Sequence, residues 1–274
     1  MKLFLLAFLL SLICFTTHAQ ELDFVIDEDL LAAWSEESLG EAETEFWPGE
    51  EANFQSQSQE EMWNVIDNEV LENDLEVRDN LDFAVEYLLD WGVSEGILDE
   101  NTVYQLDTVN LIEQNQVNTT FYYFYVDLAN DQGDVEKFWV GVYSPPTGGK
   151  TALDAWHIQP LLIGETGMNF LDRNWPISLT FAQFENNEYD AREAFFWGLN
   201  EVIDKAVAGG VLENNNYYVD TIYVAAVNQT PEATYFLYDA YIRPQGHPGL
   251  EVLFTVREST NGDFEVEKYV LFPA

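Results

Sequence analysis

The feature that most constrains the fold of this chain is an internal repeat with an offset of about 114 residues. The segment 96–101 reads Gly-Ile-Leu-Asp-Glu-Asn, and the segment 210–215 reads Gly-Val-Leu-Glu-Asn-Asn. Asp-Thr-Val at 107–109 is matched by Asp-Thr-Ile at 220–222, and each copy then runs into a segment rich in Tyr and Phe. Two copies are too few for a solenoid, so the repeat predicts two compact domains in tandem.

Hydrophobic periodicity predicts the same elements in both copies, namely one helix followed by four strands. A helix that covers one face of an antiparallel meander belongs to the α+β class. The first copy has the helix over 79–91 and strands over 103–113, 120–129, 136–144 and 155–163. The second copy has an opening strand over 177–184, the helix over 191–207, and strands over 217–228, 233–243, 250–258 and 264–272.

Residues 1–19 are typical of a secretory signal peptide, with a basic start at Lys2, an apolar run to Phe15 and the small residue Ala19 at the end. This run is too short to span a bilayer comfortably, so we expect a secreted, extracellular protein with no membrane segment. The only cysteine, Cys14, lies inside the signal. The mature chain is therefore expected to have no disulfide and no cysteine nucleophile or cysteine metal ligand.

The chain is strongly acidic, with 50 Asp and Glu against 10 Lys and Arg and a formal net charge of −40. Proteins bind nucleic acids through Lys and Arg on the phosphates, so a nucleic-acid partner is excluded. An anionic membrane surface is disfavoured for the same reason. The charge favours cationic partners or loosely held divalent cations, and adaptation to salty surroundings explains it equally well.

Residues 20–77 contain 19 of the acidic residues and no Lys, Arg or His, yet they include six aromatic residues. This composition predicts a largely disordered acidic arm that docks through its rings onto the same chain, a second copy or another secreted protein. The first domain is then expected over 78–163, and the second domain, with its linker, over 164–274.

Residues 109–121 and 225–236 each place a Gln, a short turn and an aromatic run in the same order. This order is similar to that of the cystatin superfamily, in which a Gln-x-Val-x-Gly hairpin precedes a strand rich in Tyr and Phe. The resemblance covers 78–163 and 177–272, and it implies two tandem cystatin-like domains, each a helix packed on an antiparallel sheet. The positions that match the family's inhibitory hairpin are Gln114, Asn115, Gln116, Val117, Asn118, Gln229, Thr230, Pro231, Glu232 and Ala233.

The resemblance implies inhibition of papain-like cysteine proteases, but both hairpins depart from the family pattern. Gln116 and Pro231 stand where the family has Val, and Asn118 and Ala233 stand where it has Gly. A wedge that lies close to a cleft wall benefits from the missing side chain of Gly. Asn118 and Asn228 also begin N-glycosylation sequons, so a glycan is predicted on each hairpin.

No motif in the chain points to catalysis or to a cofactor. His157 and His247 lack the further ligands that a zinc site needs, and no Asp-x-Asp-x-Asp-Gly loop is present for calcium. We therefore expect a secreted, acidic, non-catalytic protein for binding or assembly, whose partner is another extracellular protein or a second copy. One alternative is an inhibitor of a papain-like cysteine protease, and another is a calcium- or mineral-associated secreted protein.

Overall fold

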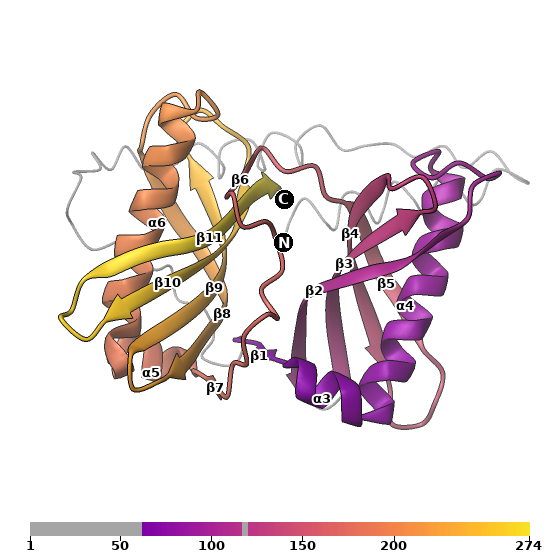
Figure 1. Ribbon diagram of the computed structural model, residues 1–274, viewed down its shortest axis with the longest axis horizontal. Helices are drawn as coiled ribbons and strands as arrows, with labels where there is room; N and C mark the ends of the chain where they lie inside the picture. The colour runs from indigo at the N-terminus through magenta and orange to yellow at the C-terminus, as the bar shows by residue number, and fades with distance from the viewer. Residues whose placement is uncertain (1–61, 117–119) are drawn as a thin grey trace, which may run out of the picture. The chain divides into compact units, whose positions relative to one another are not determined.

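The computed structural model describes residues 62–116 and 120–274, which form two antiparallel sheets and four α-helices (Figure 1). The expected signal peptide and residues 20–61 of the expected acidic arm lie outside this range. So do Val117, Asn118 and Thr119 of the first expected hairpin.

The first sheet has five strands. They are β1 (Asn64–Val65), β2 (Tyr104–Gln116), β3 (Thr120–Asn130), β4 (Val135–Ser144) and β5 (Thr151–His157). Their order in the sheet is the order in the sequence, and every neighbouring pair is antiparallel. Helix α4 (Leu75–Ser94) contacts β2 to β5 and covers one face of this sheet (Figure 1).

The second sheet has six strands. They are β6 (Leu162–Ile163), β7 (Ile177–Ser178), β8 (Tyr217–Gln229), β9 (Ala233–Pro244), β10 (Leu250–Ser259) and β11 (Phe264–Pro273). The order is β6-β11-β10-β9-β8-β7, again antiparallel throughout. Helix α6 (Ala191–Ala208) follows the short elements α5 (Phe181–Glu185) and a 3-10 turn (Glu188–Asp190), and it contacts β9, β10 and β11.

Acidic residues begin the helices nearest the expected arm. The Asp67 side chain accepts from the backbone N–H of Val70 at the start of α3 (Asn68–Asn73), and the Asp74 side chain accepts from the N–H groups of Glu76 and Val77 at the start of α4. Such caps satisfy donors that have no partner inside the helix. Part of the acidic segment is therefore regular structure: β1, α3 and the first turn of α4 lie within residues 62–77.

The long strands of the second sheet are buried on both faces. On β9, Phe236 and Tyr238 pack in the cluster that contains α6. Leu237 of the same strand packs in a different cluster, which contains α4 and the first sheet. Neighbouring residues of a strand point to opposite faces, so one face of the second sheet packs on its helix and the other packs against the first sheet.

The expected α+β class, with two tandem cystatin-like domains that each pack a helix on a sheet, is wrong. The described chain is mostly β, with 43% of it in strands and 25% in helices. The two-residue strands β1, β6 and β7 extend the sheets beyond the four-stranded meanders that were expected. The face of each sheet away from its helix is also buried in part, against the other sheet, and not left to solvent as in a one-sided helix-on-sheet unit.

Other boundaries shift by a few residues. Helix α4 starts at Leu75 where 79 was expected, and β5 ends at His157 where a strand to 163 was expected, with β6 forming separately. The expected opening strand of the second half is two residues long and is followed by α5. The boundaries at 78 and 164 stay a prediction. In the described residues, no helix is long and apolar enough to cross a bilayer.

Gly198 lets α6 lie close to β10. A Cβ atom at this position would come within 2.4 Å of Val256 Cγ2 and 2.8 Å of Phe254 Cε2, both in the buried core. We expect Gly198→Ala to lower the free energy of unfolding by about 1–3 kcal/mol, because overpacking outweighs the gain in helix propensity of about 1 kcal/mol. Thermal or urea unfolding measures this change. Asp204→Ala, at an exposed position of the same helix, is the matched control and should stay within about 0.5 kcal/mol of the wild type.

Candidate functional site

Three carboxyl groups meet where the two sheets pack on each other. Glu113 comes from β2, Asp239 from β9 and Glu251 from β10. Glu113 is 1% exposed, Asp239 is fully buried, and Glu251 is partly buried. Burial of Asp and Glu is rare unless they are paired, so this carboxyl cluster requires a chemical explanation.

The hydroxyl of Tyr125 joins the carboxyl groups across the two sheets. Tyr125 belongs to β3 of the first sheet, and its Oη lies 2.9 Å from Asp239 Oδ2 and 2.5 Å from Glu251 Oε1 in the second sheet. Both distances are in the normal range for O–H···O hydrogen bonds, and the shorter one is at its lower limit. Tyr125 itself is 1% exposed.

Counting protons shows that this geometry needs protonated carboxyl groups. A tyrosine hydroxyl has one proton, so it donates fully to one acceptor only. The second short contact is a good hydrogen bond only when that carboxyl carries a proton and donates it to Tyr125 Oη. Glu113 and Asp239 also lie close enough for their charges to interact, and two neighbouring carboxylate ions would repel each other in this buried place.

The electrostatic environment favours the protonated forms. Burial raises the pKa of Glu113 to about 8, with a further contribution from the charge of Glu251. Burial and the neighbouring Glu113 raise the pKa of Asp239 well above its ordinary value, and burial and Asp239 do the same for Glu251. Burial, followed by the charge of Asp239, raises the pKa of Tyr125. No Lys, Arg or His is among the described groups that shift these pKa values.

The carboxyl cluster has spare hydrogen-bonding capacity. Within the described part of the chain, Glu113 Oε1 and Asp239 Oδ1 are buried with no hydrogen-bond partner of normal geometry, and so is the indole N–H of Trp139. No group of three or more His, Cys, Asp or Glu side chains among the described residues is arranged to hold a metal ion. The contacts that the structure shows within the cluster are the hydrogen bonds of Tyr125 to Asp239 and Glu251.

A row of stacked aromatic rings lies beside the carboxyl cluster on the same face of the first sheet. Trp63 stacks on Tyr123 with ring centroids 4.4 Å apart, and Tyr123 stacks on Trp139 at 4.7 Å. Gly141 provides the room, because a Cβ there would come within 2.7 Å of the Tyr123 ring. Trp63 also donates its backbone N–H to Tyr223 O of β8 at 2.7 Å, which ties this row to the second sheet.

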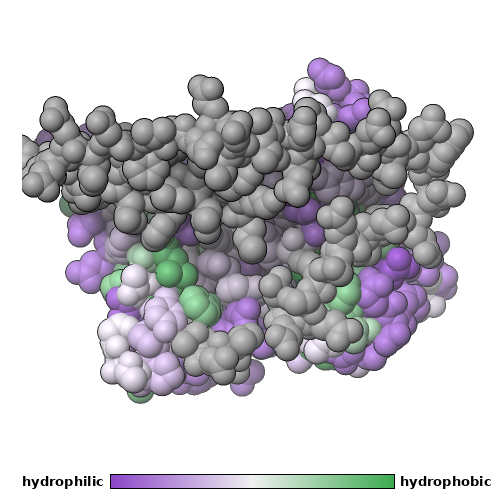
Figure 2. Space-filling model, turned by 180° about the vertical axis from the view of Figure 1, so that it is seen from behind, coloured by the Kyte–Doolittle hydropathy of each residue, from purple (hydrophilic) through white to green (hydrophobic). Residues whose placement is uncertain are grey.

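The edge of the first sheet at β5 carries two large exposed apolar side chains. Trp156 is 55% exposed and Leu153 is 43% exposed, and both belong to this strand. Trp156 is opposite Trp139 in the register, so it continues the aromatic face outward. Among the described residues, no strand pairs with the outer edge of β5. Seen from behind, the coloured residues are mainly hydrophilic, with hydrophobic side chains in small patches (Figure 2).

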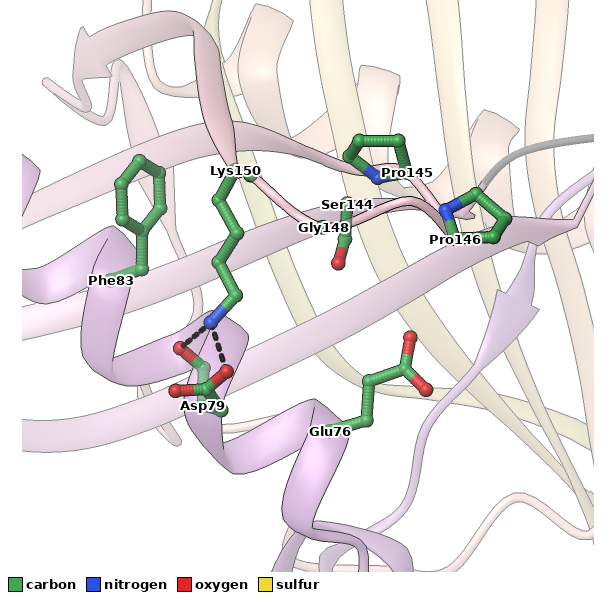
Figure 3. A pocket seen from close by; sticks show the side chains of 9 residues that line it. Glu76, Asp79, Phe83, Ser144, Pro145, Pro146, Gly148 and Lys150 are labelled. Carbon is green, nitrogen blue, oxygen red and sulfur yellow. Dashed lines mark hydrogen bonds and ion pairs between the residues drawn. The ribbon is translucent and has the colours of Figure 1, made fainter.

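A cavity of about 550 Å³ lies between the start of α4 and the turn from β4 to β5. Figure 3 shows Lys150 pointing to Asp79, where its ammonium group pairs with the carboxylate and also donates to the backbone O of Asp79 at 2.8 Å. Pro145, Pro146 and Phe83 supply the apolar lining. Among the residues that line the cavity, the basic group of Lys150 is thus paired with Asp79, and the lining also includes Glu76 and Ser144.

The described residues of the two expected hairpins lie at the end of β2 and at the turn between β8 and β9. Gln114 is only 8% exposed, which does not favour contact with a protease cleft, while Asn115 is partly buried near the end of β2. In the second hairpin, β8 ends at Gln229 and β9 begins at Ala233. The turn is closed by the N–H of Thr230, which donates to Ala233 O at 2.9 Å. The inhibitory role of these residues stays a prediction.

Of the two predicted glycosylation sites, only Asn228 lies within the described residues. Asn118 lies outside the described residues. The side-chain amide of Asn228 donates to the backbone O of Asn174 at 2.8 Å, so a glycan on this nitrogen would change that contact. Glycosylation stays a prediction at both positions.

His157, which the sequence did not favour as a metal ligand, and the turn between β3 and β4 both have contacts within the described chain. His157 Nε2 lies 2.7 Å from Glu136 Oε2. Asn130 Oδ1 accepts from the backbone N–H groups of Gln132 and Asp134, which shapes the turn between β3 and β4. This turn is explained by its own hydrogen bonds.

Comparison with known proteins adds no family. No family model matches the chain, and no curated protein matches it either. Membership of the cystatin superfamily therefore stays a prediction.

The carboxyl cluster was not predicted from the sequence, because the chain has 50 acidic residues and composition does not distinguish the three that meet between the sheets. One signal was available: Asp239 is the only charged residue between Thr234 and Ile242, a run of apolar and aromatic residues. A single carboxyl inside a buried strand predicts a partner in the core. The identity of that partner depends on the packing of the two sheets, which the sequence pattern does not reveal.

Tyr125→Phe tests whether the hydroxyl holds the cluster. We expect the free energy of unfolding near pH 6 to fall by about 2–3 kcal/mol, because two buried carboxyl groups lose their shared partner. Chemical denaturation measures the change. Tyr218→Phe makes the same change at a side chain that is 44% exposed, and it should have an effect below about 0.5 kcal/mol. Equal stability of Tyr125→Phe and the wild type would contradict the assignment.

Proposed function

We propose that this chain is a secreted, acidic, non-catalytic binding protein that takes an extended, basic segment of another protein along the outer edge of β5. The observation that carries the proposal is the combination of a strand edge with no partner among the described residues and two large exposed apolar side chains, Leu153 and Trp156. Addition of a strand to an open sheet edge is a common mode of peptide recognition.

The backbone of β5 is oriented for strand addition. Ile158 donates its N–H to Lys137 O at 2.7 Å, so this residue directs its backbone groups toward β4. Backbone direction alternates along an antiparallel strand, so Trp156 also faces β4, while Ala155 and His157 direct their N–H and C=O groups outward. These outward groups are the ones that an added strand would bind.

The charge of the protein favours a basic segment over a second copy. Asp154 is exposed between Leu153 and Trp156, and the chain has a net charge of −40. Two such edges would repel each other, and charged residues on an edge strand commonly prevent self-pairing. The register of β4 and β5 shifts between Ala152 and Ala155, next to Asp154. A segment that carries both Lys or Arg and apolar residues would offer its charges to Asp154 and apolar contact to Trp156.

The test uses a labelled peptide of about eight residues in which Lys and Val alternate, a length typical of a strand. A second peptide has the same lysines and prolines in place of the valines, so it keeps the charge and cannot form a strand. Fluorescence anisotropy at about 0.15 M salt limits attraction by charge alone. We expect the alternating peptide to bind at least about tenfold more tightly than the proline peptide, a difference of about 1.4 kcal/mol.

Ala155→Pro locates the binding edge. It removes an outward N–H that β4 does not use, so we expect the affinity for the alternating peptide to fall about tenfold, or about 1.4 kcal/mol. Ala155→Val keeps the N–H and is the matched control, and circular dichroism verifies that both variants fold. Trp156→Ala should also weaken binding, whereas Val103→Ala, at a side chain that is 80% exposed, should not. Equal binding of both peptides, or no effect of Ala155→Pro, would contradict the proposal.

A further inference from the structure

We propose that Glu113, Asp239, Glu251 and Tyr125 form a proton-dependent latch, which holds the two sheets together in acidic and neutral solution and releases them in alkaline solution. The latch is separate from the β5 edge and does not depend on the function proposed for that edge. Its members come from β2 and β3 on one side and from β9 and β10 on the other.

The latch joins the sheets directly. Tyr125 of β3 contacts Asp239 of β9 at 2.9 Å and Glu251 of β10 at 2.5 Å, and Glu113 of β2 interacts with Asp239. Every one of these contacts crosses from the first sheet to the second. When the carboxyl groups lose their protons, the same contacts bring negative charges together in a buried place, where their repulsion is strong.

The ionisable groups around the latch provide no compensating positive charge. Among the described residues, the ionisable groups that shift the pKa values of the latch carboxyls, of Tyr125 and of the nearby Tyr123 and Tyr223 are all carboxyl or phenol groups. They are Glu113 on β2, Tyr123 and Tyr125 on β3, Asp154 on β5, Tyr223 on β8, Asp239 on β9 and Glu251 on β10. Burial raises the pKa of Tyr123 to about 12 and that of Tyr223 still higher, so below pH 9 only the carboxyl groups titrate.

The sign of the pH dependence follows from proton binding. In the unfolded chain, Asp and Glu lose their protons near pH 4. In the folded chain, Glu113 keeps its proton up to about pH 8, and Asp239 and Glu251 have pKa values shifted in the same direction. The folded state therefore binds more protons at these three groups, so their contribution to stability is largest at low pH and falls as the pH rises toward 8.

The experiment follows the full chain between pH 6 and pH 9 by thermal unfolding and small-angle X-ray scattering. We expect the melting temperature of the wild type to fall by at least about 5 °C over this range. Below the melting temperature, the radius of gyration should increase at pH 9, because the sheets separate before they unfold. A constant melting temperature, or a fall in melting temperature with no increase in the radius of gyration, would overturn the latch.

Neutral replacements identify which carboxyl groups cause the pH dependence of the melting temperature. Glu113→Gln and Asp239→Asn keep nearly the shape of a protonated acid, with a carbonyl acceptor and an N–H donor in place of the O–H, but they cannot ionise. Each should reduce the pH-dependent fall in melting temperature, and each should be more stable than the wild type at pH 9. Glu232→Gln makes the same change at an exposed position and should behave like the wild type.

If the Glu113→Gln or Asp239→Asn protein has the same pH profile as the wild type, the latch is wrong. The same conclusion follows if Glu232→Gln flattens the profile as much as they do. Should a variant fail to fold, the scattering series on the wild type decides the question.

Discussion

The packing of the two sheets on each other is the contact on which the rest of the structure depends. Each sheet has its own helix on one face, but aromatic and aliphatic side chains also fill much of the other face, and these side chains need a second surface to exclude water. The hydrogen bonds from Tyr125 to Asp239 and Glu251 lie inside this contact and link opposite sheets. Residue Trp63, next to β1, adds a backbone hydrogen bond to Tyr223 of the second sheet.

A buried carboxyl cluster without a positive partner is costly unless protons neutralise it. Replacing such a cluster by apolar residues is often neutral or stabilising, so its presence is poor evidence for stability as such. A proton-dependent contact gives it another purpose, because it makes the association of the sheets sensitive to pH. The chain's net charge of −40 also raises the pKa of the buried carboxyl groups, because negative charge opposes their ionisation.

The open edge at β5 and the latch use different parts of the first sheet. Trp156 lies opposite Trp139, and Tyr123 stacks between Trp139 and Trp63, so a row of aromatic side chains leads from the edge to the region where the sheets meet. Tyr125 also contacts Trp139 edge to face, with ring centroids 6.4 Å apart. Register pairing and ring stacking thus link the two ends of this row.

The sequence by itself determined the local elements. The repeat and the hydrophobic periodicity located α4, α6 and the long strands to within a few residues, because these patterns depend on neighbours along the chain. The tertiary structure decided what covers each sheet, which short segments extend its edges, and which of 50 acidic residues become buried. Glu113 and Asp239 are 126 positions apart in the sequence and lie close together in the fold, and no local sequence pattern predicts this proximity. The candidate site is therefore a product of how two sheets pack, and the sequence alone could give only the strands that carry it.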